Sequence, residues 1–326
     1  MITIEGSEEG EIYDLVHYLK TYKHLLDDPS LVICLDSVAF TEDTVTITSS
    51  LRGCINFDLK ATVADNNLHS GMGGGVCPNP YHILNCALMR VQDFKTQEVI
   101  EELQLKEIPP HRLEEVTYMG ENLEHLSQSF PLLETTKSMA YHASGGDTKK
   151  ENVQLHINSF WRSQLSIIGI EGLPTDINSA GNVIYKEMKL RCSMRIPPRI
   201  SAKFVVDTLR EKLTAEGPDT FGAKIEFTCV DAGDGFDAPD LPPALKAQLN
   251  EATAEVFNGA KPLYVGCGGS IPFMDVFFEL FPKANFMLTG VGFPDSNAHS
   301  ANENLRLDYC RKLTTTIALM LGKMKE

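Results

Sequence analysis

The spacing of apolar residues separates the outer parts of the chain from its middle. Over 11–26 the apolar residues recur at helical spacing, and the continuous apolar run 31–35 is typical of a strand buried on both faces. The same alternation of strand and helix returns in the last third of the chain. There the pattern predicts strands at 263–265 and 285–288 and helices at 243–257, 274–281 and 305–323. Both outer parts therefore predict α/β structure.

The middle of the chain has a different pattern. Residues 44–48 and 56–63 alternate strictly between apolar and polar positions, which is typical of half-buried strands in an antiparallel sheet. Residues 96–150 are polar and weakly patterned, and we interpret them as a long connection with helical pieces, one of them at 97–105. The remaining predicted elements are strands at 183–196 and 223–230 and helices at about 83–91 and 201–215. Together they predict an α+β layer with helices on one face of the sheet.

These patterns place a domain boundary near Ser49-Ser50 and a second one at the linker that starts at Gly233. The predicted organisation is one α/β domain, formed by 1–49 and 233–326 and containing a mostly parallel sheet. The α+β domain of residues 50–232 is inserted into it.

Composition excludes some functions and favours one cell compartment. The formal net charge is -15 and no basic stripe is present, so a nucleic-acid partner is not expected. No apolar run approaches the 18 residues of a membrane span. The eight cysteines are scattered without a C-x-x-C pair, which argues against a thiolate zinc finger. Because we find no secretory signal pattern, we expect reduced thiols and a cytoplasmic location.

Glu8 and Glu9 form the first candidate site. They follow the short alternating run 1–4 and precede the first predicted helix, at a strand-to-helix turn of the kind where α/β sheets bind ligands. Two adjacent carboxylates repel each other, so one of them is usually stabilised by a metal ion or by a raised pKa. The alternative is a helix start that is rich in acids because the helix dipole favours them.

Four other residues have both a functional and a structural interpretation. Asp36 follows a buried strand and is either a cap or a site residue, and His69 stands in a glycine-rich turn. Arg195 ends a predicted strand, and His299 precedes the last helix. Each of these alone is more often a turn, cap or surface residue. The other seven histidines are interpreted as solvated or structural: His17, His24, His82, His111, His125, His142 and His156.

The order and spacing of these residues closely resemble the M20 family of zinc metallopeptidases, and within it the carnosinase-like and Cys-Gly dipeptidases. The most specific pieces are EGSEE at 5–9, NNLHSGMGGG at 66–75, GCGGSIP at 266–272 and AHSANE at 298–303. The resemblance covers essentially the whole chain. It implies an α/β catalytic domain with an inserted lid domain that also forms the interface of a homodimer.

The resemblance also implies a centre of two zinc ions, with manganese as a possible substitute. Glu8 matches the general base and Glu9 a metal ligand. His299 matches the second ligand of the same metal, and Asp36 matches a ligand of the other metal. A general base needs a carboxylate that is free of the metal, and Glu8 beside a ligand meets that requirement.

The remaining matches concern the substrate, which the resemblance implies to be a dipeptide or short peptide. His69 matches the lid histidine that reaches the partner subunit's site and stabilises the oxyanion. Arg195 matches the lid arginine that holds the substrate carboxylate. Gly269 and Ser270 match the loop that contacts the substrate.

The sequence departs from the family pattern at its start. Family members carry an H-x-D motif and a bridging aspartate before the EGSEE stretch, and here the sequence starts at Met1. We therefore expect the N-terminal part of the catalytic domain to be missing, zinc binding to be incomplete and activity to be impaired, because catalytic zinc usually has three protein ligands.

Two alternatives to a dipeptidase remain open. The chain could be a catalytically inactive short paralogue that acts as a dimerisation or regulatory partner, which a coding segment for H-x-D upstream of Met1 would argue against. It could also be an M20 aminoacylase, which would cleave N-acyl amino acids and ignore dipeptides.

Overall fold

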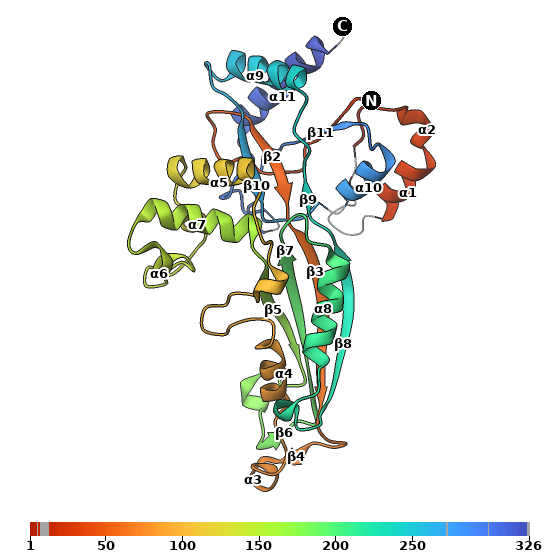
Figure 1. Cartoon of the computed structure of the whole chain (residues 1–326), viewed down its shortest axis with the longest axis vertical. Coiled ribbons are helices and arrows are strands. Elements are labelled where there is room, and N and C mark those ends of the chain that lie inside the picture. The colour runs from red at the N-terminus through yellow and green to blue at the C-terminus, as the bar shows by residue number, and fades with distance from the viewer. Residues whose placement is uncertain (5, 7–12, 272, 299, 325–326) are drawn as a thin grey trace. The chain divides into compact units, whose positions relative to one another are not determined.

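The structure is a computed structural model that describes residues 1–4, 6, 13–271, 273–298 and 300–324. The chain divides into two compact units. Unit 1 comprises 1–51, 108–160 and 236–326, and unit 2 comprises 52–107 and 161–235. Figure 1 shows the elements of both.

Within the described residues, unit 1 contains a five-stranded mixed sheet. Its strands are β1 (Leu31–Cys34), β2 (Thr46–Leu51), β9 (Phe236–Asp237), β10 (Leu263–Cys267) and β11 (Asn285–Leu288). The order is β1-β11-β2-β10, with β9 also paired to β2. β1 and β11 are parallel, as are β2 and β10, whereas β11 and β2 meet antiparallel. The sheet is therefore two parallel pairs that run in opposite directions.

Two apolar clusters pack this sheet between helices. One contains Ile47 and Met287 of the sheet with Leu249 of α9 (Pro243–Val256) and Leu313 of α11 (Leu307–Lys323). The other contains Cys34, Leu51 and Phe286 with residues of α1 (Tyr13–Thr21) and α10 (Phe273–Leu280). A short helix, α2 (Lys23–Leu26), follows α1. The central strand β2 is buried along its whole length because helices cover both faces of the sheet.

The segment 108–160 is helical. It contains α5 (Pro110–Asn122), the 3₁₀ turn η2 (Leu126–Ser129), α6 (Tyr141–Ser144) and α7 (Thr148–Trp161). α5 and α7 approach so closely that a Cβ at Gly120 would lie 2.5 Å from the Cα of Val153. The amide of Asn152 fixes the contact, since its nitrogen donates to Gly120 O at 3.0 Å.

Arg112 of α5 attaches this segment to the sheet of unit 1. Its side chain is 3% exposed. Nε donates to Asp237 Oδ1 at 2.9 Å, Nη1 to Glu115 Oε1 at 2.8 Å and Nη2 to the carbonyl of Ala238 at 2.6 Å. Ser49 of β2 donates to the second oxygen of Glu115 at 2.7 Å. The buried guanidinium thus joins α5 to β2 and β9.

Unit 2 contains a four-stranded antiparallel sheet in the order β5-β7-β3-β8. The strands are β3 (Gly53–Thr62), β5 (Gln164–Glu171), β7 (Glu187–Ile196) and β8 (Lys224–Gly233). The helices α4 (Pro80–Leu88) and α8 (Ala202–Thr214) pack their apolar residues against it. With its β-α-β-β-α-β chain order, this is a ferredoxin-like arrangement.

Smaller elements of unit 2 lie beyond one end of this sheet or on its connections. They are β4 (Leu68–His69), α3 (Ser70–Gly73), β6 (Val183–Ile184) and the 3₁₀ turns η1 (Glu101–Leu103), η3 (Ile177–Ser179) and η4 (Pro218–Thr220). β4 pairs antiparallel with β6. In Figure 1, α3, β4 and β6 gather at the end of unit 2 away from the start of β3.

The prediction of an α/β part and an α+β part is confirmed, with differences in detail. The strand predicted at 44–48 is β2, which is fully buried rather than half-buried. β5 and α7 were not predicted, and the helix predicted at 97–105 is reduced to η1. The run 1–4 is not a strand. The two units also divide the chain differently from the predicted domains 1–49, 50–232 and 233–326, because 108–160 packs with unit 1.

Candidate functional site

Asp36 lies in an exposed position two residues after β1. Its loop runs beside the segment after β11, where Thr289 N donates to Cys34 O at 3.0 Å and Ala39 N donates to Gly292 O at 2.7 Å. A Cβ at Gly290 would lie 1.7 Å from the carbonyl oxygen of Ser37, so only glycine fits between the two segments. The loop that carries Asp36 therefore packs against residues 289–292.

Gly269 and Ser270 follow β10, where Gly269 is exposed. β10 runs opposite to β1, so the sheet topology alone does not bring these residues to Asp36. However, Cys34 and Ile271 belong to the same apolar cluster. Cys34 and Ile271 therefore pack on the same face of the sheet of unit 1.

His69 and Arg195 both lie in unit 2, and the structure separates them. His69 is exposed at the end of β4, and its Nδ1 accepts a hydrogen bond from Gly71 N at 3.2 Å. Arg195 pairs with Cys54 near the start of β3, whereas β4 lies beyond Thr62 at the end of β3. Eight residue steps of strand separate Cys54 from Thr62, which corresponds to about 26 Å. These two side chains therefore do not meet within one chain.

Glu8, Glu9 and His299 lie outside the described residues. Asp36 is thus the one predicted metal ligand that the structure describes. Among the described residues, no group of three or more histidine, cysteine, aspartate or glutamate side chains is placed to hold a metal ion. The described residues alone do not form a metal site, and a zinc centre has to be argued from the undescribed ligands as well.

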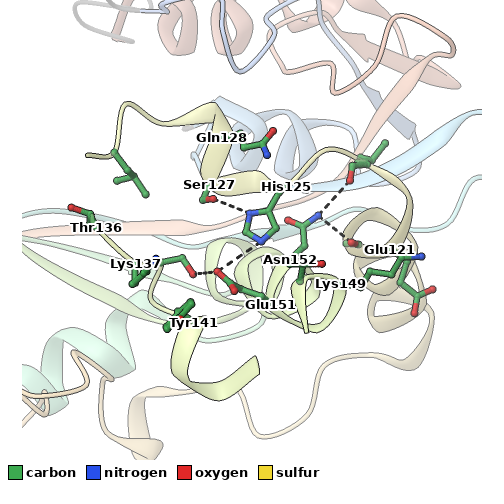
Figure 2. Close-up of a pocket in the computed structure, with 15 residues that line it drawn as sticks. Glu121, His125, Ser127, Gln128, Thr136, Lys137, Tyr141, Lys149, Glu151 and Asn152 are labelled. Carbon is green, nitrogen blue, oxygen red and sulfur yellow. Dashed lines mark hydrogen bonds and ion pairs between the residues drawn. The ribbon is translucent and has the colours of Figure 1, made fainter. Parts of the chain in front are cut away.

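A pocket of about 610 Å³ lies within the segment 108–160, apart from all the predicted site residues. It is formed by the end of α5, η2, the loop 132–138, α6 and the start of α7. Figure 2 shows His125, Ser127 and Glu151 pointing toward one another inside it. His125 Nδ1 lies 2.8 Å from Ser127 Oγ, and Ser138 Oγ donates to Glu151 Oε1 at 2.5 Å. The sequence interpretation of His125 as solvated or structural missed this cluster, because the surrounding stretch has no apolar periodicity.

His156 of α7 is buried, at 1% exposure, and is a structural histidine. It packs against Phe40 and Phe160, and neither ring nitrogen has a hydrogen-bond partner among the described residues. Burial lowers its pKa to about 4, with a smaller contribution from the nearby His125. The ring is therefore neutral at physiological pH and acts as an aromatic core residue.

The family model described as the peptidase dimerisation domain matches residues 49–220, which is more than half of the chain. The cysteinylglycine-S-conjugate dipeptidase of Corynebacterium striatum is 24% identical over 306 residues, covering 93% of this chain and 62% of the relative. The Beta-Ala-His dipeptidase of Rattus norvegicus is 26% identical over 330 residues, covering 98% and 63%. The chain thus spans a little over three fifths of the length of these two relatives.

Solved structures show the same fold. Human carnosine dipeptidase 1 superposes with a TM-score of 0.75 at 21% identity, covering 98% of this chain and 65% of the other. The di-peptidase Dug1p of Saccharomyces cerevisiae gives a TM-score of 0.70 at 22% identity, covering 97% and 64%. No helix within the described residues is long and apolar enough to cross a membrane. All eight cysteines lie in the described part of the chain, and none of them is in a disulfide bond.

Proposed function

The chain belongs to the M20 peptidase family, and we propose that it is part of a metal-dependent dipeptidase that works as a homodimer. The observation that carries this proposal is the extent of the similarity. Relatives named as dipeptidases align with 93% and 98% of this chain, well beyond the dimerisation domain at 49–220. The segments outside that domain contain Glu8, Glu9, Asp36, Gly269, Ser270 and His299.

The proposed roles divide between the two units. Glu8 accepts a proton from the attacking water, and Gly269 and Ser270 contact the peptide. Arg195 pairs with the substrate carboxylate, for which a guanidinium is suited by its two parallel donors. His69 stabilises the negative charge that develops on the scissile carbonyl oxygen.

The distance between His69 and Arg195 supports a dimeric site. Because about 26 Å of β3 separates their ends of unit 2, a single chain cannot place both side chains on one dipeptide. Two copies can do so if each provides His69 to the other. The surface around His69 suits such a contact, since Met72 and Val76 beside it are 82% and 83% exposed.

Zinc is the proposed metal, with manganese as a possible substitute. Glu9, Asp36 and His299 would hold two ions, and carboxylate and imidazole are ordinary zinc ligands. Bound zinc polarises a carbonyl group and makes water a better nucleophile at neutral pH. Eight cysteines outside any disulfide bond also favour a reducing compartment such as the cytoplasm.

The test is hydrolysis of Cys-Gly and β-Ala-His by the chain with added zinc or manganese, followed over hours as release of free amino acid. We expect metal-dependent release that falls about 10²–10⁴-fold in Glu8→Gln, because the base is lost. Zinc binding by that variant should stay close to wild type. Glu11→Gln is the matched control and should retain activity. Absence of metal-dependent release, or full activity in Glu8→Gln, would contradict the proposal.

The β5 strand is the proposed dimer contact. It lies at the edge of the sheet of unit 2, and Ile167, Ile168 and Ile170 on it are 51%, 59% and 52% exposed. A long, apolar, unpaired edge is a template for pairing with another chain. Pairing of β5 with the β5 of a second copy would continue the sheet and bury these isoleucines.

The molar mass in solution tests this contact by light scattering after gel filtration. We expect a wild-type dimer, and the double variant Ile168→Lys/Ile170→Lys should shift toward the monomer because like charges would face each other across the new edge. Phe221→Lys is the control, since Phe221 is 74% exposed and precedes β8, the strand at the opposite edge of the sheet from β5. A monomeric wild type, or an unchanged dimer in the double variant, would refute the β5 interface.

A further inference from the structure

The pocket within 108–160 has no part in the proposed peptidase site, and its lining suggests a ligand of its own. We propose that it binds a small zwitterion with an ammonium and a carboxylate group, the chemistry of a free α-amino acid. The pocket is lined wholly by residues between 120 and 152. Its volume of about 610 Å³ is within the range of small-molecule sites.

Glu151 is the proposed partner of the ammonium group. It is 9% exposed, and both its close contacts are made by Oε1. Ser138 Oγ donates to that oxygen at 2.5 Å, and His125 Nε2 lies 3.8 Å from it, which is beyond hydrogen-bond distance. Among the described residues no cation is therefore hydrogen-bonded to this largely buried carboxylate. Glu151 lines the pocket, so the ammonium group of a ligand that enters the pocket can donate to Oε2.

The wall behind Glu151 is held together by hydrogen bonds, which favours binding. Asn152 is 2% exposed, and its Oδ1 accepts from Leu126 N at 2.7 Å while its Nδ2 donates to Gly120 O at 3.0 Å. These bonds hold η2 and the end of α5 against α7. His125 is fixed in turn by the hydroxyl of Ser127. A site whose side chains are already held in place loses little entropy when a ligand binds.

Lys137 and Lys149 are the proposed partners of the carboxylate group. Both line the pocket and are exposed, and neither makes an ion pair among the described residues. Lys137 is positioned by Tyr141, because its Nζ lies 5.1 Å from the centre of that ring. Figure 2 shows Lys137 and Tyr141 on one side of Glu151 and Lys149 on the other. Cations therefore lie at the rim and an anion lies inside, as a zwitterion requires.

The remaining lining suits an aliphatic side chain. Leu123 and Leu132 contribute to the walls together with the ring of Tyr141. An amino acid such as L-leucine would thus place its ammonium group on Glu151, its carboxylate at a lysine and its side chain on apolar surface. Neither a simple anion nor a simple amine uses all three features.

Isothermal titration calorimetry of the full chain with L-leucine tests the proposal. The protein is kept free of metal, so hydrolysis does not contribute and failure of binding leaves the proposed peptidase function untouched. We expect L-leucinamide, which lacks the carboxylate, and N-acetyl-L-leucine, which lacks the ammonium, each to bind about tenfold more weakly than L-leucine. Equal or tighter binding of either analogue, or no binding of L-leucine, would overturn the zwitterion site.

Variants locate the binding in this pocket. Glu151→Gln should weaken L-leucine about tenfold, and Lys149→Gln, which changes an exposed side chain, should also weaken it while the fold is retained. Glu124→Gln is the matched control, because Glu124 is exposed and outside the lining. Unchanged affinity in both Glu151→Gln and Lys149→Gln would refute the site. The dipeptide Gly-Leu carries the same two charges, and tighter binding of Gly-Leu than of L-leucine would support the site with a dipeptide as its occupant if Glu151→Gln weakens that binding as well; Gly-Leu binding that Glu151→Gln leaves unchanged belongs to the peptidase site and counts against this pocket as a dipeptide site.

Discussion

The sheet of unit 2 and the segment 108–160 of unit 1 are held together in opposite ways. In unit 2, β3 alternates between buried and half-buried residues, so that Ile55, Phe57 and Leu59 are fully buried against α4 and α8. The charged residues of β3 form ion pairs with the neighbouring strand β7 on the other, more exposed face of the sheet. The segment 108–160 instead buries polar side chains: Arg112, Glu151, Asn152 and His156 are each less than 10% exposed.

This difference determines where a substitution is most harmful. Apolar burial is roughly proportional to area and tolerates exchange of one apolar residue for another of similar size. A buried polar group depends on its partner, because the group left behind keeps its full cost of desolvation. We therefore expect charged residues to matter most in 108–160 and least on the sheet of unit 2.

Arg112→Met should give the largest loss of stability. It removes the guanidinium that donates to Asp237 and Glu115 and leaves two carboxylates near the sheet without that partner. Breaking a buried pair costs about 3–5 kcal/mol. Urea unfolding followed by the fluorescence of Trp161, the single tryptophan, measures this loss. A loss below 1 kcal/mol would show that the buried guanidinium is no more important than a surface one.

The same contrast explains what the sequence could predict of the fold. β3 and β7 were predicted because each has one wet and one dry face, so their residues alternate. β2 was predicted with the wrong burial because four of its six residues are Thr and Ser, which look half-exposed although helices cover both faces. α7 was not predicted because its buried residues include Glu151, Asn152 and His156, which carry no apolar period.

The candidate site could be predicted only through family motifs. Asp36, His69, Arg195 and His299 are each ordinary in their local context, and their shared role stays a prediction from the motifs. The pocket around Glu151 could not be predicted at all. Its members come from α5, η2, the loop 132–138, α6 and α7, and their polar residues look like those of any exposed connection.

His156 should make stability depend on pH. Its pKa is about 4 in the folded chain and about 6.5 when exposed. As the pH falls, His156 therefore takes up its proton in the unfolded chain before it does so in the folded chain. The part of the unfolding free energy that is present above pH 6.5 is lost as the pH falls toward 4. At pH 5 the loss is about 2 kcal/mol.

His156→Phe isolates this effect from other titrating groups. Phenylalanine matches the neighbouring Phe40 and Phe160 and does not titrate. The difference in unfolding free energy between wild type and variant should change by about 2 kcal/mol between pH 7.5 and pH 5. A difference that stays constant with pH would show that the buried ring is accommodated as well when charged as when neutral.

The ion pair between Arg191 and Asp58 should give the smallest effect and so completes the comparison with Arg112. Arg191 lies on β7 and Asp58 lies on the neighbouring strand β3. Nη2 of Arg191 donates to Asp58 Oδ2 at 2.8 Å. The hydrogen bond from Arg191 lowers the pKa of Asp58. However, Arg191 is 46% exposed, whereas Arg112 is 3% exposed. Water solvates each partner when the other is removed, so Arg191→Met should cost less than about 1 kcal/mol.

Salt separates the two arginines further. A cost that arises from exposed charges should shrink when the salt concentration rises from about 0.05 M to about 1 M, because the screening length falls to about 3 Å. The cost of Arg112→Met should change much less, since its partners are buried. Unfolding of the two variants in parallel at both salt concentrations gives this result directly. If Arg191→Met were as costly as Arg112→Met and equally insensitive to salt, burial would not be what distinguishes the two regions, and the bidentate geometry of the pair would have to account for its strength.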